Sequence, residues 1–237
     1  MRRAALAILV LLAAVPVEAR IGSVADAPSI RGQNLLRKGR HELTPTFGVS
    51  LYDAYTRNLM IQASYQYHFL DWLSAGAEFT YAAPLKTALT KGIEREVARD
   101  PGWVETHPGQ EYSVSRTGLG MMALAQVSAV PLSGKLALLR RYMAYVDFHV
   151  TAGAGICMVK GIGRLSGSPE LAILVGGGLR IFPTKALSVN IDVKDYMVMR
   201  VLAQPNNTQS GSKKLTQNPA VLFGVSFFLP MVADRAP

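Results

Sequence analysis

The stretch RKGRHELTPTFGVSLYDAYTR, residues 37–57, decides the fold. From residue 41 to residue 51 apolar and polar side chains alternate, with Leu43, Phe47 and Val49 on one parity and Glu42 and Thr44 on the other. Successive side chains of a strand point to opposite faces, so this period of two predicts a strand with one apolar and one polar face. The apolar face then meets either a protein core or lipid.

Similar alternation recurs along the chain and predicts about eight antiparallel strands in total, the others being 57–69, 73–81, 119–130, 145–155, 170–182, 187–201 and 219–229. No long helical segment separates these strands. An antiparallel series of this kind closes into an up-and-down barrel. The expected fold is therefore all-β.

The connections between the predicted strands differ in length. Residues 70–72 and 183–186 form short connections, whereas 82–118, 156–169 and 202–218 are long. Short periplasmic turns and long external loops are typical of outer-membrane barrels. Two connections do not fit, because 53–56 is short on the external side and 131–142 is long on the periplasmic side.

Three features favour lipid over a soluble, lipocalin-like barrel. Most strand glycines, such as Gly48, Gly76 and Gly153, lie on the polar parity, as expected for the inner face of a narrow barrel. That parity carries Thr, Ser and Gln rather than Lys and Glu on every strand. The apolar parity has no mid-strand Lys or Arg, and Asp195 is its one charged exception, placed at an interface or turned inward by a bulge.

The N-terminus, MRRAALAILVLLAAVPVEA, predicts a cleaved signal peptide at 1–19. We expect a periplasmic segment at 20–40, the barrel at 41–229 and a tail at 230–237. Cys157 is the only cysteine, which suits a bacterial envelope protein better than a disulfide-stapled secreted domain. We therefore expect the protein to be located in the outer membrane.

Composition narrows the function classes. The 237 residues are 49% hydrophobic and 17% charged. Beyond the N-terminal stretch, the chain has no apolar run long enough for a membrane-spanning helix. The net charge of +9 suits phosphate-rich lipid headgroups, and export argues against nucleic acid. The four histidines are scattered without metal-ligand spacing, so we expect no metal and no cofactor.

The opening stretch resembles an outer-membrane β-barrel family of myxobacteria and related predatory or gliding bacteria. The resemblance is carried by the run from Lys38 to Leu43, KGRHEL, by Gly48 and Ser50 in mid-strand, and by Asp53 near the first loop. Tyr52 stands where the family pattern has Asn. Some members are similar to barrel components of the gliding-motility adhesion machinery, which implies a non-enzymatic structural or adhesin-like role.

Several charged side chains are predicted to face the barrel interior: Glu42, Glu78, Asp147, His149, Glu170, Arg180, Asp192 and Lys194. They form either an ion pathway, a catalytic cluster or a plug of mutually paired charges. Buried charges are tolerated mainly when paired, which favours the plug. His149 near Asp147 also leaves open a lipid-modifying enzyme, although no motif marks a nucleophile.

The loop at 82–118 contains an apolar repeat every four residues, at Leu85, Leu89, Ile93 and Val97. This spacing predicts a short amphipathic helix ending before Asp100-Pro101-Gly102. The apolar stripe, together with Trp103, packs on the barrel rim or binds a partner.

A basic patch precedes the first strand on the periplasmic side and consists of Arg37, Lys38 and Arg40. It is expected to meet anionic headgroups or a periplasmic partner, or to be a solvated segment. Arg31 and the pair Arg140-Arg141 would extend it.

These observations predict a structural or partner-binding barrel of an envelope-spanning assembly. Its partners would be other outer-membrane barrels, lipoproteins or periplasmic proteins, in contact with outer-membrane lipid. The alternatives are a small pore and an outer-membrane lipid-modifying enzyme.

Overall fold

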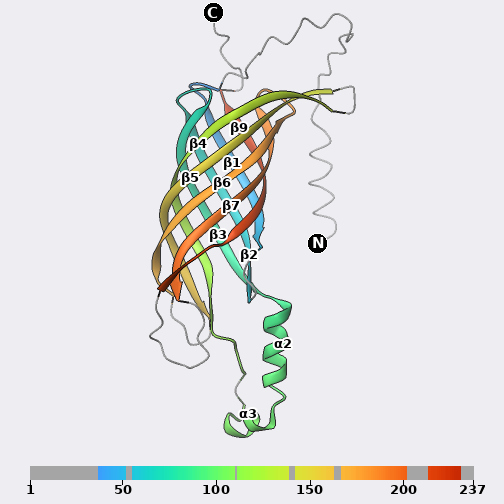
Figure 1. Cartoon of the computed structure of the whole chain (residues 1–237), viewed down its shortest axis with the longest axis vertical. Coiled ribbons are helices and arrows are strands. Elements are labelled where there is room, and N and C mark those ends of the chain that lie inside the picture. Colours follow the sequence, from blue (N-terminus) through green and yellow to red (C-terminus); the bar gives the residue numbers. More distant parts are fainter. Residues whose placement is uncertain are drawn as a thin grey trace, which may run out of the picture.

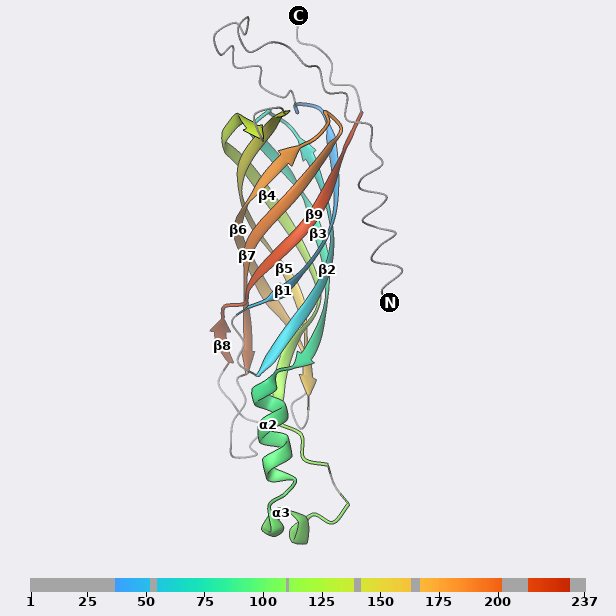
Figure 2. The same ribbon diagram turned by 90° about the vertical axis from the view of Figure 1, so that its right-hand side faces the viewer.

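Eight antiparallel strands close into a barrel (Figure 1), and the described residues contain a ninth, short strand, β8, beside it (Figure 2). The computed structural model describes residues 37–51, 55–109, 111–138, 142–162, 167–201 and 213–230. Each strand from β1 to β7 pairs with the next, β7 pairs with β9, and β9 closes on β1. The strands are β1 (His41–Ser50), β2 (Thr56–His68), β3 (Leu73–Lys86), β4 (Arg116–Leu138), β5 (Tyr142–Ile162), β6 (Pro169–Phe182), β7 (Leu187–Val201), β8 (Lys213–Thr216) and β9 (Pro219–Leu229).

Some predictions fall on residues that are not described. The predicted signal peptide at 1–19, the segment before residue 37, Arg31, Arg140 and Arg141, and the tail from residue 231 lie outside the described residues. The predicted all-β barrel itself is confirmed.

The alternation in β1 places its apolar face outside the barrel. Leu43 and Phe47 are 49% and 63% exposed, whereas Thr44 and Thr46 between and beside them are buried. The same alternation of exposed and buried positions runs along β2. A soluble barrel would show the reverse arrangement, so the outer surface is built to meet lipid.

Strands β4 and β5 are longer than the sequence pattern predicts. The expected loop at 131–142 is strand on both sides of residues 139–141, and β5 continues through part of the expected loop at 156–169 to Ile162. Register shifts between Leu119 and Met122 and between Ala129 and Leu132 insert extra residues into β4. Such bulges interrupt the period of two along β4, which is why the sequence pattern of that strand ends early.

The two ends of the barrel differ (Figures 1 and 2). At one end, here called the terminal rim, β1 begins and β9 ends. The short connections 69–72 and 183–186 lie there, and β4 ends there at Leu138, close in sequence to the start of β5 at Tyr142. At the other end, the helical rim, the 87–115 connection carries α2 (Ala88–Val97) and α3 (Pro101–Thr106). Short turns mark the periplasmic side of outer-membrane barrels, so the terminal rim faces the periplasm. The corrected β4–β5 connection removes one of the two exceptions to this rule.

Gly76 on the inner parity of β3 shows why small residues lie there. A Cβ at this position would lie 1.8 Å from the Tyr65 carbonyl oxygen and 2.7 Å from the Gln66 Cα. Gly134, in the part of β4 beyond β3, would meet nothing within 4 Å. The neighbouring strand therefore leaves no room for a side chain at Gly76.

We predict that Gly76→Ala lowers the free energy of unfolding by about 1–3 kcal/mol, because the added methyl group forces the backbone of β2 away. Gly134→Ala is the matched control and should change it by less than about 0.5 kcal/mol. Urea unfolding of the barrel in lipid vesicles measures both values. Equal effects of the two substitutions would contradict this account of the inner face.

Candidate functional site in the lumen and on the helical arm

Glu42 is the centre of a charge cluster near the terminal rim. Its side chain is 1% exposed, and one carboxylate oxygen, Oε2, lies 2.9 Å from His68 Nε2 and 3.1 Å from Arg180 Nη1. The other, Oε1, accepts a hydrogen bond of 2.7 Å from Ser226 Oγ. These side chains come from β1, β2, β6 and β9, all from inward-facing positions. The cluster therefore ties the seam between β1 and β9 to the opposite wall.

Two further contacts between a basic and an acidic side chain lie in the same half of the lumen. Arg37 Nη1 donates a short hydrogen bond to Asp147 Oδ2, and both residues are buried. His149 Nε2 lies 3.1 Å from Asp192 Oδ1, also inside the barrel. The structure thus pairs Asp147 with Arg37 and gives His149 a different carboxylate.

Glu78 forms a second cluster, deeper in the lumen. Lys194 Nζ donates to its Oε2 at 2.6 Å, and Tyr196 Oη donates to its Oε1 at 2.8 Å. Thr80 Oγ1 adds a third hydrogen bond to Oε1, at 3.2 Å. With these partners the buried carboxylate is compensated by one charge and several dipoles.

Of the eight charged side chains predicted to face the interior, all but Glu170 are buried inside the barrel, in separate groups. Glu170 is half-buried at the start of β6, where its carboxylate accepts from Ser168 Oγ at 2.6 Å. Sequence reasoning missed His68 and Tyr196. The alternation along the strands could have identified both residues as inward-facing. His68 lies two residues after the inward Gln66, and Tyr196 lies two residues after the inward Lys194.

Apolar side chains fill the lumen toward the helical rim. One contiguous buried cluster contains Met60, Ala82, Leu119, Met122, Leu124, Cys157, Val159, Ala172, Leu174, Tyr196, Val198, Ala220 and Leu222. The sequence did not predict this cluster, because apolar residues on the inner parity reduce the contrast between the two faces. An ion that moved through the lumen from the terminal rim would pass the paired charges and then reach this apolar cluster. The lumen is therefore packed in both halves.

The predicted basic patch is wrong for two of its three residues. Arg37 and Arg40 are 3% and 2% exposed, and of the patch Lys38 alone stays exposed. Arg40 donates to the carbonyl oxygens of Pro230 and Lys185, at 3.1 and 3.0 Å. A guanidinium has five donors, which suits it to closing the rim where β1, β9 and the β6–β7 turn meet.

The helical arm, residues 87–115, is fixed to the helical rim at the start of α2. Thr87 caps the helix by accepting from the Thr90 N–H at 3.3 Å, and the buried Thr90 hydroxyl donates to the Tyr55 carbonyl at 2.6 Å. Glu94 Oε2 accepts from Lys86 Nζ at 2.8 Å.

Glu94 also links α2 to the segment that returns to β4. Its Oε1 accepts from the Val114 N–H at 3.2 Å and lies 3.7 Å from Arg116 Nη1. Burial by itself raises the pKa of the Glu94 carboxyl, but the hydrogen bonds from Lys86 and Val114 and the charge of Arg116 lower it overall. Glu94 is therefore ionised at neutral pH and holds the arm in place.

The five predicted partner-binding residues fall into different environments. Leu85 belongs to β3 rather than to a helix, because Thr87 caps α2 one residue before its start at Ala88. Leu89 is 51% exposed, whereas Ile93 and Val97 are half-buried. Trp103 in α3 stacks on His107, with ring centroids 3.7 Å apart. Leu89 is thus the member of the helical stripe left open to solvent.

The outer surface is an apolar band. Its exposed side chains come from every barrel strand and include Phe47, Ile61, Phe79, Val127, Ile156, Leu171, Val193 and Phe223. Asp195, the predicted exception, stays on the outer parity at the helical end of β7, where it accepts from the Asn218 N–H at 2.8 Å. Tyr65, Trp72 and Tyr81 are exposed toward strand ends, as in an aromatic girdle.

No helix among the described residues is long and apolar enough to cross a bilayer. The same residues contain no group of three or more His, Cys, Asp or Glu side chains arranged to hold a metal ion.

Comparisons with known proteins find no family model and no curated protein that matches the chain. Among solved structures it is similar to Neisserial surface protein A, with a TM-score of 0.47 and 11% identity over 80% of this chain and 97% of that one. It is also similar to the N-terminal barrel domain of Pseudomonas aeruginosa OprF, with a TM-score of 0.37 and 8% identity over 81% and 98%. The crystal structure of Yersinia pestis Ail gives 0.33 and 15% over 81% and 99%.

These likenesses are distant, so the assignment rests on the chain's own geometry. A closed antiparallel barrel of eight strands with an apolar outer band and a filled polar interior is built for a bilayer. The chain is an outer-membrane β-barrel.

We predict that Glu42→Gln lowers the free energy of unfolding by about 3–5 kcal/mol, because Arg180 loses the charge that compensates it in the lumen. The double variant Glu42→Gln/Arg180→Met should recover part of this loss, since no buried guanidinium then lacks its partner. Urea unfolding in vesicles gives both values. A single variant as stable as the natural chain would contradict the network.

Proposed function

We propose that this barrel is a non-enzymatic, structural component of an envelope-spanning assembly and recruits partners through the helical arm. The observation that carries the proposal is the combination of a rigidly fixed arm and exposed apolar side chains on it. Thr90 and Glu94 fix the arm to the barrel, while Leu89 and Val104 are each 51% exposed. Because the terminal rim faces the periplasm, these side chains lie outside the membrane at the opposite rim.

Apolar side chains held in a fixed position on a water-facing arm favour binding over mere loop closure. A connection between β3 and β4 needs only polar residues, and ordering side chains costs conformational entropy. An arm that is already ordered loses less conformational entropy when a partner binds. Because the terminal rim faces the periplasm, the arm lies on the outer side of the membrane, and the partners expected there are other barrels and lipoproteins exposed at the outer surface.

The gliding-motility context is the finer part of this proposal. It is supported by the resemblance of the opening stretch, from Lys38 to Asp53, to barrels of myxobacteria and their relatives. The adhesion-complex role follows from that resemblance and from nothing in the geometry of the barrel.

The packed lumen favours a structural role over a pore. The charge clusters of Glu42 and Glu78 and the apolar cluster near Leu222 occupy successive parts of the interior. An enzymatic role is not part of the proposal, because His149 faces Asp192 inside the lumen, away from lipid.

The exposed apolar side chains of the arm provide the main test. We predict that Leu89→Ser/Val104→Ser reduces recovery of envelope partners about tenfold or more in affinity purification from native membranes in mild detergent, because the apolar contact area is lost. Arg95→Ser/Glu105→Ser, which changes exposed polar residues of the same two helices, is the matched control. Heat-modifiable migration on gels reports that each barrel is folded. Equal recovery with both double variants, or no partner of the natural chain, would refute recruitment by the arm.

The pore alternative is tested by conductance. We predict that the purified chain gives no steady large conductance in planar bilayers, since the lumen is filled by paired charges and apolar side chains. An open porin inserted under the same conditions is the control for insertion and detection. Porin-like currents from folded protein would replace the structural role with a pore.

A further inference from the structure

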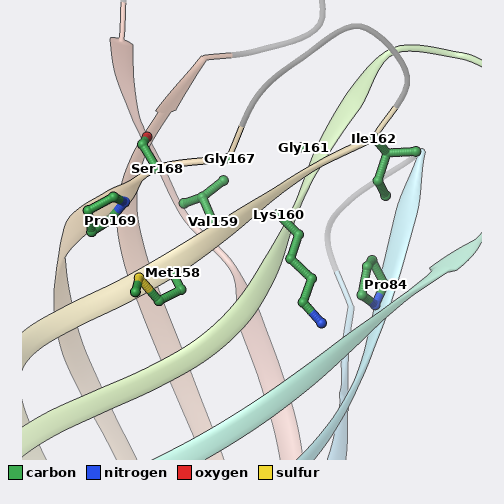
Figure 3. A pocket seen from close by; sticks show the side chains of 9 residues that line it. All are labelled: Pro84, Met158, Val159, Lys160, Gly161, Ile162, Gly167, Ser168 and Pro169. Atoms are coloured by element: carbon green, nitrogen blue, oxygen red, sulfur yellow. The ribbon is translucent and has the colours of Figure 1, made fainter.

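A groove lies on the outside of the barrel at the helical rim (Figure 3). It has a volume of about 470 Å³ and is lined by the end of β5, the start of β6 and Pro84 of β3. The lining residues are Pro84, Met158, Val159, Lys160, Gly161, Ile162, Gly167, Ser168 and Pro169. It is mostly apolar and carries a single ionisable side chain, Lys160.

Gly118 of β4 lies beside the groove, between β3 and β5. It pairs with Lys160, and a Cβ there would lie 2.7 Å from the Pro84 Cβ. Pro84 therefore occupies the space that a side chain at position 118 would need, and it lines the groove together with Lys160. Figure 3 shows Lys160 extending from β5 toward the strand that bears Pro84.

On β5, Lys160 lies at the edge of the apolar band that is nearest the helical rim. The outward positions before it, Ile156 and Met158, are 57% and 50% exposed and face the acyl chains. The ammonium lies 4.7 Å from the centre of the Tyr81 ring and 3.4 Å from its hydroxyl. Among the described residues no carboxylate lies within ion-pairing distance of this ammonium. A cation and an aromatic ring at this height are placed at the headgroups of the leaflet.

We propose that the groove binds an outer-leaflet lipid that carries a phosphate, with one acyl chain along Met158 and the phosphate at Lys160. The occupant is a lipid because the groove opens on the surface that the bilayer covers. A phosphate is the anionic group of such lipids, and it complements the ammonium of Lys160. This site is independent of partner recruitment by the helical arm.

The test measures lipid binding to the folded chain by native mass spectrometry from detergent micelles. The probes are a phosphorylated, multiply acylated glucosamine disaccharide, phosphatidylglycerol, diacylglycerol without phosphate, and inorganic phosphate. We expect both phosphorylated lipids, or the glycolipid alone, to bind more tightly than the other two probes. Binding of both would indicate a general lipid-phosphate site, and binding of the glycolipid alone would identify that lipid as the occupant.

Two substitutions in the groove separate its charge from its shape. Lys160→Gln should weaken binding of the phosphorylated lipids about tenfold, because a charge-assisted hydrogen bond is lost. Ile162→Trp should weaken it by filling the groove while Lys160 stays. Arg57→Gln removes an exposed charge from β2 at the same rim and should leave binding within about twofold, as the matched control.

Three results would overturn the proposal. They are equal effects of Lys160→Gln and Arg57→Gln, diacylglycerol binding as tightly as the phosphorylated lipids, and inorganic phosphate binding as tightly as the lipids. Heat-modifiable migration of every variant shows that the barrel is folded in each measurement.

Discussion

Closure of the backbone hydrogen-bond network is the constraint on which the rest of this structure depends. Within a bilayer no water is available to strand edges, so every strand needs a neighbour on both sides. Here the seam is formed by β1 and β9, which pair from His41 with Leu229 to Ser50 with Ala220. Arg40 reinforces this seam at the terminal rim by donating to the carbonyl groups of Pro230 and Lys185.

Closing eight strands also fixes how much the interior can hold. A barrel of this size has room for side chains and little else, which explains both the glycine at position 76 and the need to compensate each buried charge. Glu42 and Glu78 each have a cation and hydroxyl partners from other strands. The interior is thus a second core, polar toward the periplasm, apolar in the layer of Leu119 and Leu222, and polar again at the helical rim, where Asn58, Arg200 and Asn218 are buried.

With the interior filled, the surfaces available for function are the rims and the lipid-facing wall. The helical arm, held by Thr90 and Glu94, offers apolar side chains to water, whereas the groove beside Lys160 offers an apolar surface and a charge to lipid. Both features arise at the helical rim, where β3 and β4 diverge around the long connection. A barrel anchored by lipid and presenting a fixed arm is well suited to a structural role in the envelope.

The sequence by itself determined the fold class and which face of each strand meets lipid, because a period of two is a local property that any strand displays. It also located the charges of the lumen and the helix of the long connection. It did not determine the extent of β4, since the bulges near Gly120 and Pro131 break the local pattern. It also missed the continuation of β5, where the inward residues Cys157 and Val159 are apolar and reduce the contrast between the two faces. Tertiary structure alone decided that Glu42 pairs with Arg180, that Arg37 and Arg40 are buried, and that Pro84 and Lys160 line one groove. These outcomes depend on the register between strands far apart in the sequence, which barrel closure sets.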